Sequence, residues 1–284
     1  MTTSATDEQR AQAEQLRQWH RQPPILVLPN AWDAASARLF EVIGFRAVAT
    51  TSSGVASALG YPDGERMSRA QMIEAIARIT HAVSVPVTAD IESGYGATLE
   101  QKLSTIREVI ATGAVGINIE DSAQPDRPEL VEIAAQVEVI RAIRDAAAAW
   151  GAPLVINART DGYLSHPGDE PGLLEETIQR GNAYLAAGAD CVYPIGARDA
   201  GTIGTLAKGI AGPINILAGP QTPTIPELEA LGVARVSVGG GLTRVALGAV
   251  RRAAEELLRQ GTFTHMAQDA LPSAEFQRLF EGAS

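Results

Sequence analysis

The sequence predicts a single (β/α)8 barrel over residues 1–284, with a helical extension at 1–22 and a helical tail at 272–284. Three observations predict this fold. The chain has 284 residues, an ordinary length for one such barrel. Eight short apolar segments recur along it, and helical patterns separate them. Strands that alternate with helices form a parallel sheet, and eight such units close into a barrel.

The eight expected strands are apolar on both faces, as buried parallel strands are. They are, in order, Ile25–Pro29, Ala47–Ser52, Pro86–Ile91, Gly116–Glu120, Leu154–Arg159, Cys191–Ile195, Ile214–Leu217 and Arg235–Val238. Successive strands start roughly 20 to 40 residues apart, which leaves room for a crossover helix each time.

Between these strands, apolar residues recur with the period of a helix. The clearest stripes are Met72/Ile73/Ile76/Ile79, Leu103/Ile106/Ile110 and Ile133/Val137/Ile140/Ile143. A doubly wound open sheet is the alternative fold. No glycine fingerprint follows the first strand, which counts against that alternative.

Charge and composition exclude several classes of partner. With 33 acidic and 23 basic residues the net charge is −10, and no Lys/Arg cluster is long enough to hold a nucleic-acid backbone. Acidic surfaces also repel anionic lipids, so neither nucleic acid nor membrane is an expected partner. No run of about 18 apolar residues is present, so no membrane span is expected.

The only cysteine, Cys191, cannot form a disulfide within one chain and suits a reducing cytoplasm. The first residues include Asp7 and Glu8 and no apolar run, so no signal peptide is expected. We therefore predict a cytoplasmic protein. Because its net charge is negative, binding an anionic substrate requires a metal ion or an arginine that reverses the field locally.

Polar residues end three consecutive expected strands, and alternation along a strand puts some of them on one face. These sets are Asp90 and Glu92, then Asn118 and Glu120, then Asn157, Arg159 and Asp161. A single Asp at a strand end is more often a helix cap or a turn former. Three successive strands with this pattern instead indicate a site at the carboxyl end of the barrel.

The chemistry of this set predicts a hard divalent cation. Close carboxylates do not all ionise in a low-dielectric pocket without a cation. Oxygen ligands without histidine or thiolate suit Mg²⁺, with Mn²⁺ as the alternative. The Arg159 guanidinium offers a fork that binds a carboxylate or a phosphate.

Two glycine-containing turns are further candidates. Ser52, Ser53 and Gly54 form a hydroxyl-rich turn that can hold a carboxylate or an enolate oxygen, or that is an ordinary polar turn. The turn 239–241 can cradle a phosphate or lead tightly into the last helix. Asp63 lies in a turn on either interpretation.

Taken in order, the motifs resemble the isocitrate lyase/phosphoenolpyruvate mutase superfamily, from about Pro29 to about Leu247. The motifs are Pro29-Asn-Ala-Trp-Asp33, Ser52-Ser-Gly54, Gly60-Tyr-Pro-Asp63, Asp90-x-Glu92-Ser-Gly-Tyr-Gly96, Asn118-Ile-Glu-Asp121 and Asn157-Ala-Arg-Thr-Asp161. One motif alone would be weak, but the ordered set is specific.

The resemblance implies a Mg²⁺-assisted reaction through an enolate of a 2-oxo acid. It implies that Asp90 binds the metal directly and that Glu92 and Glu120 bind it directly or through water. Asp63 would join that water network. By the same resemblance, Arg159 binds the far carboxylate or phosphoryl group, so Arg159, Glu120 and Asp63 are the expected catalytic residues.

The resemblance assigns substrate binding to the Ser52–Gly54 turn and Arg159, and we add Asn118, which shares a strand face with Glu120. The substrate-binding set is Ser52, Ser53, Gly54, Asn118 and Arg159. The family further implies a homo-oligomer, a dimer or a tetramer, often a homotetramer whose last helix is exchanged between neighbours.

The sequence departs from the family after the fourth strand. Residues 122–128 lack the cysteine that the lyases use as a proton donor and the mutase's lysine and asparagine, and a helix is expected almost at once. Asp90-x-Glu92 also replaces the more usual Asp-x-Asp. Cys191 is expected to be a small buried hydrophobe. His166, Asp126 and Arg127 are the remaining loop candidates, each also interpretable as a solvated side chain.

These observations predict a Mg²⁺-dependent carbon–carbon lyase or decarboxylase. Its substrate would be a small 2-oxo or 2-hydroxy dicarboxylic acid that reacts through a metal-bound enolate. Phosphoenolpyruvate or phosphonopyruvate mutase or hydrolase chemistry is the first alternative. A barrel that binds a metabolite without turnover is the second, and a phosphate-binding biosynthetic barrel is the third.

Overall fold

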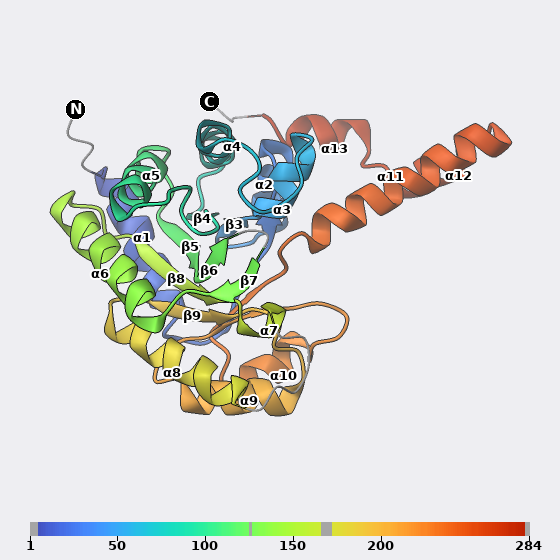
Figure 1. The fold of residues 1–284 in the computed structure, drawn as a ribbon. Helices are drawn as coiled ribbons and strands as arrows, with labels where there is room; N and C mark the ends of the chain where they lie inside the picture. Colours follow the sequence, from blue (N-terminus) through green and yellow to red (C-terminus); the bar gives the residue numbers. More distant parts are fainter. Residues whose placement is uncertain (1–4, 125–126, 166–171, 282–284) are drawn as a thin grey trace.

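Eight parallel strands form the closed centre of the structure (Figure 1), a computed structural model that describes residues 5–124, 127–165 and 172–281. The strands of the ring are β1 (Leu26–Leu28) with β2 (Asn30–Ala31), β3 (Val48–Thr50), β4 (Val87–Asp90), β5 (Gly116–Glu120), β8 (Val155–Thr160), β9 (Cys191–Pro194), β10 (Asn215–Leu217) and β11 (Arg235–Ser237). Each lies inside one of the eight expected segments or extends one residue past it, except β2, which directly follows the first expected segment. The barrel prediction is therefore confirmed.

The first strand of the barrel is divided at Pro29, and this division closes the ring. β1 pairs with β11, whereas β2 pairs with β3. Proline has no N–H to donate to a strand ladder, so a break at this position is expected. On the opposite side of the barrel, a bridge between Val192 and Ile214 joins β9 to β10.

Helices surround this ring, as Figure 1 shows. They are α2 (Ala34–Ile43), α3 (Ser52–Ala58), α4 (Arg69–Ala82), α5 (Leu99–Ala111), α6 (Ile133–Ala149), α7 (Gly162–Ser165), α8 (Leu173–Ala186), α9 (Ala200–Gly209) and α10 (Ile225–Ala230). Caps fix where several of them begin: Ser68 and Gln71 form a capping box at the start of α4. From the predicted stripe on α4, Met72, Ile76 and Ile79 are buried.

The N-terminal helix α1 (Asp7–Trp19) packs against the amino ends of the strands. Its Leu16 is fully buried in a cluster that includes Leu26 on β1 and Val155 on β8. Arg17 ties the helix to the barrel, because its Nε lies 2.8 Å from a carboxylate oxygen of Asp190.

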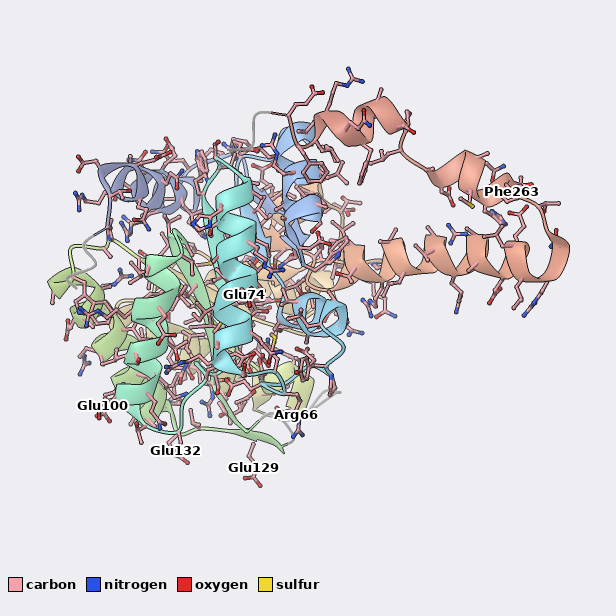
Figure 2. All side chains as sticks on the ribbon, turned by 90° about the horizontal axis from the view of Figure 1, so that it is seen from above. Arg66, Glu74, Glu100, Glu129, Glu132 and Phe263 are labelled. Carbon is pink, nitrogen blue, oxygen red and sulfur yellow. The ribbon has the colours of Figure 1, made fainter. Side chains whose placement is uncertain are left out.

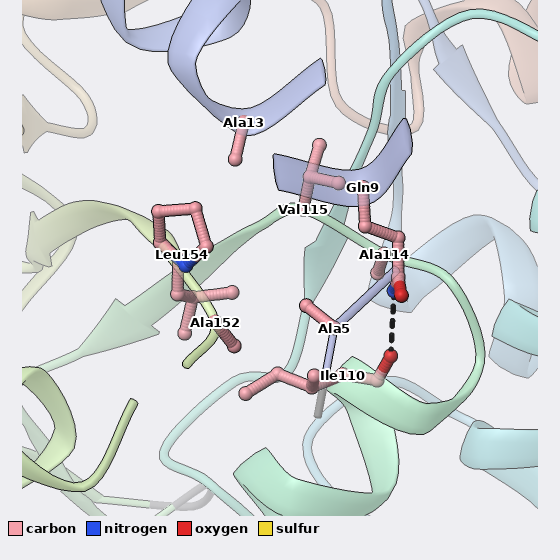
Figure 3. Close-up of a pocket in the computed structure, with 9 residues that line it drawn as sticks. Ala5, Gln9, Ala13, Ile110, Ala114, Val115, Ala152 and Leu154 are labelled. Atoms are coloured by element: carbon pink, nitrogen blue, oxygen red, sulfur yellow. Dashed lines mark hydrogen bonds between the residues drawn. The ribbon is translucent and has the colours of Figure 1, made fainter. Parts of the chain in front are cut away.

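A small cavity lies under α1 (Figure 3). Its volume is about 10 Å³, and its lining is almost wholly apolar. The hydrogen bond drawn in the figure runs from Gln9 Nε2 to the carbonyl oxygen of Ile110, at 3.0 Å. The cavity is far too small for a metabolite and lies at the end of the barrel opposite to the carboxyl ends of the strands.

A two-stranded hairpin follows the fourth barrel strand. It consists of β6 (Ser122–Gln124) and β7 (Arg127–Leu130), paired antiparallel, and α6 begins only at Ile133. The expectation that a helix begins almost at once was therefore wrong. The residues of β6 and β7 show neither a helical period nor a clear alternation, so no sequence pattern indicated this hairpin.

The C-terminal part leaves the barrel as an arm. Helix α11 (Gly241–Gln260) projects outward, and α12 (Thr264–Asp269) and α13 (Ser273–Arg278) turn back along it (Figure 1). Figure 2 shows Phe263 on the outer part of this arm, away from the barrel. Arg38 Nε donates to the carbonyl oxygen of Leu279 at 2.8 Å, which ties the end of the arm to α2. Within the described ranges, no helix has both the length and the apolar character needed to cross a membrane.

Candidate active site

The predicted polar set converges at the carboxyl ends of three neighbouring strands. In the parallel register, Asp90 on β4 lies beside Asn118 on β5, and Asn118 lies beside Asn157 on β8. One level further along, Glu120 lies beside Arg159. Neighbours in register point to the same face of a sheet, so the expected convergence of acids and arginine is present.

Arg159 is held by two carboxylates. Its Nε and Nη2 donate to the two oxygens of Asp161 at 2.5 and 2.8 Å, and its Nη1 lies 2.7 Å from Glu120 Oε2. A guanidinium carries five N–H donors. Three are engaged in these contacts, which leaves two for a ligand. The two carboxylates thus orient the Arg159 guanidinium and leave part of it able to bind a ligand.

Asp90 has one engaged and one free carboxylate oxygen. Its Oδ2 accepts a hydrogen bond from the backbone N–H of Ser52 at 3.0 Å. Its backbone N–H donates to Thr50 Oγ1 at 2.8 Å, which fixes the end of β4 against β3. The second oxygen, Oδ1, is buried and has no partner among the described residues. An orphan carboxylate oxygen in a buried site is costly unless a cation or water occupies the adjacent space.

Glu92 lies in a tightly bonded loop after β4. Its two oxygens accept from the Tyr95 hydroxyl at 2.9 Å and from the Glu65 backbone N–H at 2.8 Å. Glu65 Oε1 accepts in return from the Ser93 and Tyr95 backbone N–H groups. Glu65, Glu92 and Tyr95 all have left-handed backbone, with φ of 51 to 52°. Such strain in non-glycine residues persists where surrounding contacts over-determine it, often at functional sites.

Three of these acids have raised pKa values because they are buried close to one another. Burial, with the charge of Asp90, raises the pKa of Glu92 to about 7. Burial likewise raises the pKa of Glu120 well above its ordinary range, although the Arg159 charge opposes this. The pKa of Asp63 is raised by burial and by Asp90, while a hydrogen bond from Ser52 lowers it. Such a set favours binding of a cation that relieves the repulsion.

The donor set fits a magnesium ion held largely through water. Within the part of the chain that the structure describes, no three His, Cys, Asp or Glu side chains form a ready-made metal cluster. Mg²⁺ commonly keeps several waters and uses only one or two carboxylates. The free Oδ1 of Asp90 can serve as the direct ligand. Glu92 and Glu120, both occupied by other contacts, would then bind through water.

The Ser52–Gly54 turn begins helix α3 and lies against the turn after β11. Thr51 caps the helix and accepts from the Gly54 N–H at 3.4 Å. A side chain at Gly54 would lie 2.7 Å from Thr243 Oγ1, and one at Gly240 would lie 2.7 Å from Ser53 Oγ. Glycine is therefore required for this close approach.

The turn 239–241 is a tight structural turn. The backbone N–H groups of Val238 and Gly239 both donate to Asn30 Oδ1 at 2.8 Å, and the Gly241 N–H donates to the Val238 carbonyl at 3.0 Å. These three N–H groups are therefore engaged within the protein. The structure favours the tight-turn interpretation.

Sequence reasoning gave no role to several residues that shape the site. Tyr95 and Asp121 stand inside quoted motifs, but a motif does not show what a side chain contacts. Asp121 is fully buried and accepts from the Asp161 N–H at 3.0 Å and the Tyr184 hydroxyl at 2.7 Å. Glu65 and Arg235 carried no sequence signal, because their partners are 27 or more residues away along the chain.

Four residues were candidates for the proton donor in place of the missing loop cysteine. The structure describes Cys191 fully, but not the side chains of the other three. Cys191 is free and buried, and burial raises the pKa of its thiol to about 12, as a small buried hydrophobe requires. Asp126 and His166 lie outside the described residues. Arg127 lies on β7, and its side chain is likewise outside the described part.

Fold and site together define a class. Barrel enzymes place reacting groups at the carboxyl ends of their strands, and this end carries buried acids, one orphan carboxylate oxygen and an oriented arginine. The chain is a (β/α)8-barrel protein with the kind of site at which barrel enzymes act on small anions.

Comparison with known proteins gives the family. The model of the phosphoenolpyruvate phosphomutase family matches residues 16–258. A crystal structure from Burkholderia cenocepacia J2315, named only as a lyase/mutase, is 42% identical with a TM-score of 0.89 and covers 97% of both chains. The 2,3-dimethylmalate lyase of Eubacterium barkeri is 32% identical and aligns over 78% of this chain and 77% of its own. Phosphonopyruvate hydrolase, solved with oxalate and Mg²⁺, is 26% identical with a TM-score of 0.82 and covers 94% of each chain.

The chain therefore belongs to the phosphoenolpyruvate phosphomutase family, within the isocitrate lyase/phosphoenolpyruvate mutase superfamily. The resemblance inferred from the ordered motifs is confirmed.

Proposed function

We propose that this protein is a Mg²⁺-dependent carbon–carbon lyase or decarboxylase that acts on a small 2-oxo or 2-hydroxy dicarboxylic acid. The single observation that carries the proposal is the orphan Oδ1 of Asp90, buried among acids whose pKa values are raised. A site of that composition needs a cation. Bound there, Mg²⁺ supplies Lewis-acid stabilisation of the negative charge that develops on an enolate oxygen.

Two anion-binding features favour a dicarboxylic acid over a monoacid. Arg159 keeps two N–H donors free after its contacts with Asp161 and Glu120. The Ser52–Gly54 turn begins α3. The N–H groups of Ser52 and Gly54 donate to Asp90 and Thr51, which leaves the Ser53 N–H at the start of the helix to bind a carboxylate. Arg159 would bind one carboxylate of the substrate, and the Ser52–Gly54 turn would bind the other. Cleavage of the bond next to a carboxylate then leaves an enolate within reach of both.

Neighbouring groups keep these residues in place. Asp161 and Glu120 orient the guanidinium of Arg159, and Ser52 N–H orients Asp90. Asp63, whose pKa is affected by Ser52 and by Asp90, would join the water network around the cation. A pre-oriented site of this kind lowers the barrier by avoiding reorganisation during the reaction.

A turnover screen followed by NMR tests the proposal. The panel is oxaloacetate, 2-methylisocitrate, 2,3-dimethylmalate, phosphoenolpyruvate and phosphonopyruvate, each with and without Mg²⁺. The expected result is Mg²⁺-dependent release of pyruvate or CO₂ from one diacid, lost in Glu120→Ala. The matched control is Glu129→Ala, in the exposed part of β7.

Two other results would redirect the proposal. Turnover of phosphoenolpyruvate or phosphonopyruvate alone would establish phosphorus–carbon chemistry instead. Tight Mg²⁺ binding with no turnover of any member would contradict the lyase or decarboxylase proposal and favour a metabolite-binding barrel.

We further propose that the protein is a homo-oligomer, a dimer or tetramer in which α11 packs on a second copy. Leu247, Val250 and Leu258 recur along α11 and are 58%, 63% and 86% exposed. An apolar stripe of this size on a projecting helix needs a cover. Val250→Glu should lower the mass measured by light scattering, whereas the exposed Arg251→Ala should not. An unchanged mass in Val250→Glu would contradict the arrangement.

A cytoplasmic location stays a prediction. It is supported by the single cysteine, Cys191, which is buried and free.

A further inference from the structure

A buried arginine lies inside the barrel, below the acids. Arg235 on β11 is 0% exposed, yet its hydrogen-bond partners among the described residues are the neutral side chains of Asn118 and His20. Its Nη2 lies 3.3 Å from Asn118 Oδ1, and its Nη1 lies 3.5 Å from His20 Nε2. Burying a guanidinium beside neutral partners costs free energy of desolvation that no ion pair among the described residues offsets, which is typical of residues kept for function.

The contacts of Asn118 give its amide one orientation. Oδ1 accepts from Arg235 Nη2 and from Asn157 Nδ2, the latter at 2.7 Å. A guanidinium has donors only, so the Asn118 atom that faces it must be the oxygen. Nδ2 therefore points away from Arg235. No described residue accepts a hydrogen bond from it.

The free amide group lies next to the proposed metal ligand. Asn118 is the register neighbour of Asp90, whose Oδ1 is the orphan oxygen. The N–H groups of Asn118 thus lie beside the place where a cation and a substrate oxygen would meet.

Arg235 is itself oriented from the N-terminal helix. His20 Nδ1 lies 2.7 Å from the Leu16 carbonyl oxygen, so Nδ1 carries the proton and Nε2 is left as an acceptor. That acceptor faces Arg235 Nη1 at 3.5 Å. Arg235 thus donates in two directions, from Nη1 to His20 at the end of α1 and from Nη2 to Asn118.

We propose that Arg235 is a positioning residue for the reaction. Together with Asn157 it fixes the amide of Asn118 so that Nδ2 donates to an anionic oxygen of the substrate. This inference rests on the proposed function, because it assumes that an anionic ligand binds beside Asp90.

Oxalate binding by calorimetry in saturating Mg²⁺ tests the inference without turnover. Arg235→Met and Asn118→Leu remove the two groups with uncharged side chains of similar size. Each variant is expected to bind oxalate at least about 10-fold more weakly than the unaltered protein. Because Arg235 acts through Asn118, the double variant is expected to bind no more weakly than Asn118→Leu alone.

A matched arginine controls for a purely structural effect. Arg17→Met removes a partly buried guanidinium that ties α1 to Asp190, far from the site. It should lower the melting temperature and leave the oxalate dissociation constant unchanged. Thermal unfolding of every variant without ligand shows whether a loss of oxalate binding comes from a loss of stability.

The outcomes separate the inference from the proposed function. If the unaltered protein binds oxalate and Arg235→Met binds it equally well, the inference is wrong and the function stands. Additive losses in the double variant would also overturn it. If the unaltered protein binds no oxalate with Mg²⁺, the inference fails, because no anion then binds beside Asp90. The proposed function is decided separately, by the turnover screen.

Discussion

Arg159 and Asp161, two residues apart on and just after β8, form a two-pronged ion pair with N–O distances of 2.5 and 2.8 Å. Their alternate positions place both side chains on the same face of the strand. Asp161 is held in turn by the Ser122 hydroxyl at 2.6 Å. The arginine is therefore oriented before any ligand arrives.

Asp161→Asn should reduce kcat/KM by roughly 100-fold, because it removes one oxygen of the fork and lets Arg159 turn away from the substrate. The measurement is steady-state kinetics on the diacid found in the turnover screen. Asp145→Asn, an exposed change on α6, is the control. Equal kcat/KM in both variants would show that Asp161 does not position Arg159.

Removal of Mg²⁺ should lower thermal stability through Asp90. At a Mg²⁺ concentration about 100 times the dissociation constant, binding contributes about 2.7 kcal/mol, or roughly 5 °C in melting temperature. Asp90→Asn should abolish this increment because it removes the charge of the direct ligand. Differential scanning fluorimetry with EDTA and with Mg²⁺ measures it. An equal increment in the variant would place the ion elsewhere.

Gly54→Ala should destabilise the protein by about 1 to 3 kcal/mol through overpacking. The added carbon would lie 2.5 Å from Thr51 Cγ2 and 2.9 Å from Trp32 Cβ. Urea unfolding measures the change. In Gly248→Ala the nearest atom, Arg252 Nη1, is 3.9 Å away, so no loss is expected there. Equal stability of the two variants would contradict the close approach.

Acidification should destabilise the protein through His20. Burial, followed by the charge of Arg235, lowers the pKa of His20 to about 4 from its ordinary 6.5. The unfolded chain binds a proton below pH 6.5 that the folded chain accepts only near pH 4, so folding stability falls across that window. The full effect is about 3 kcal/mol.

His20→Gln isolates this contribution. The variant should lose less unfolding free energy than the unaltered protein between pH 7 and pH 4, because Gln does not titrate. Urea unfolding at the two pH values gives the difference. His81→Gln, on the more exposed end of α4, is the control. Parallel losses in His20→Gln and the unaltered protein would exclude His20 as the source.

Much of the barrel could be predicted because its signals are local. Buried strands such as Gly116–Glu120 read as apolar runs, and helices such as α4 show both a stripe and a cap. The hairpin β6–β7 was missed, because short strands over residues without clear alternation leave no periodic signal. The tight-turn interpretation of 239–241 could not be chosen from the sequence for a different reason: Asn30, which accepts from the Val238 and Gly239 N–H groups, is 208 or 209 residues away.

The sequence by itself determined the barrel and the chemical character of its site. Period, length and the ordered acids depend on residue type and spacing alone, which is why Asp90, Glu120 and Arg159 could be named together. Only the tertiary structure decided which atoms are occupied and which are free: the orphan Oδ1 of Asp90 and the amide orientation of Asn118. Hydrogen bonds form between atoms that folding brings together across long stretches of chain, and no local pattern records them.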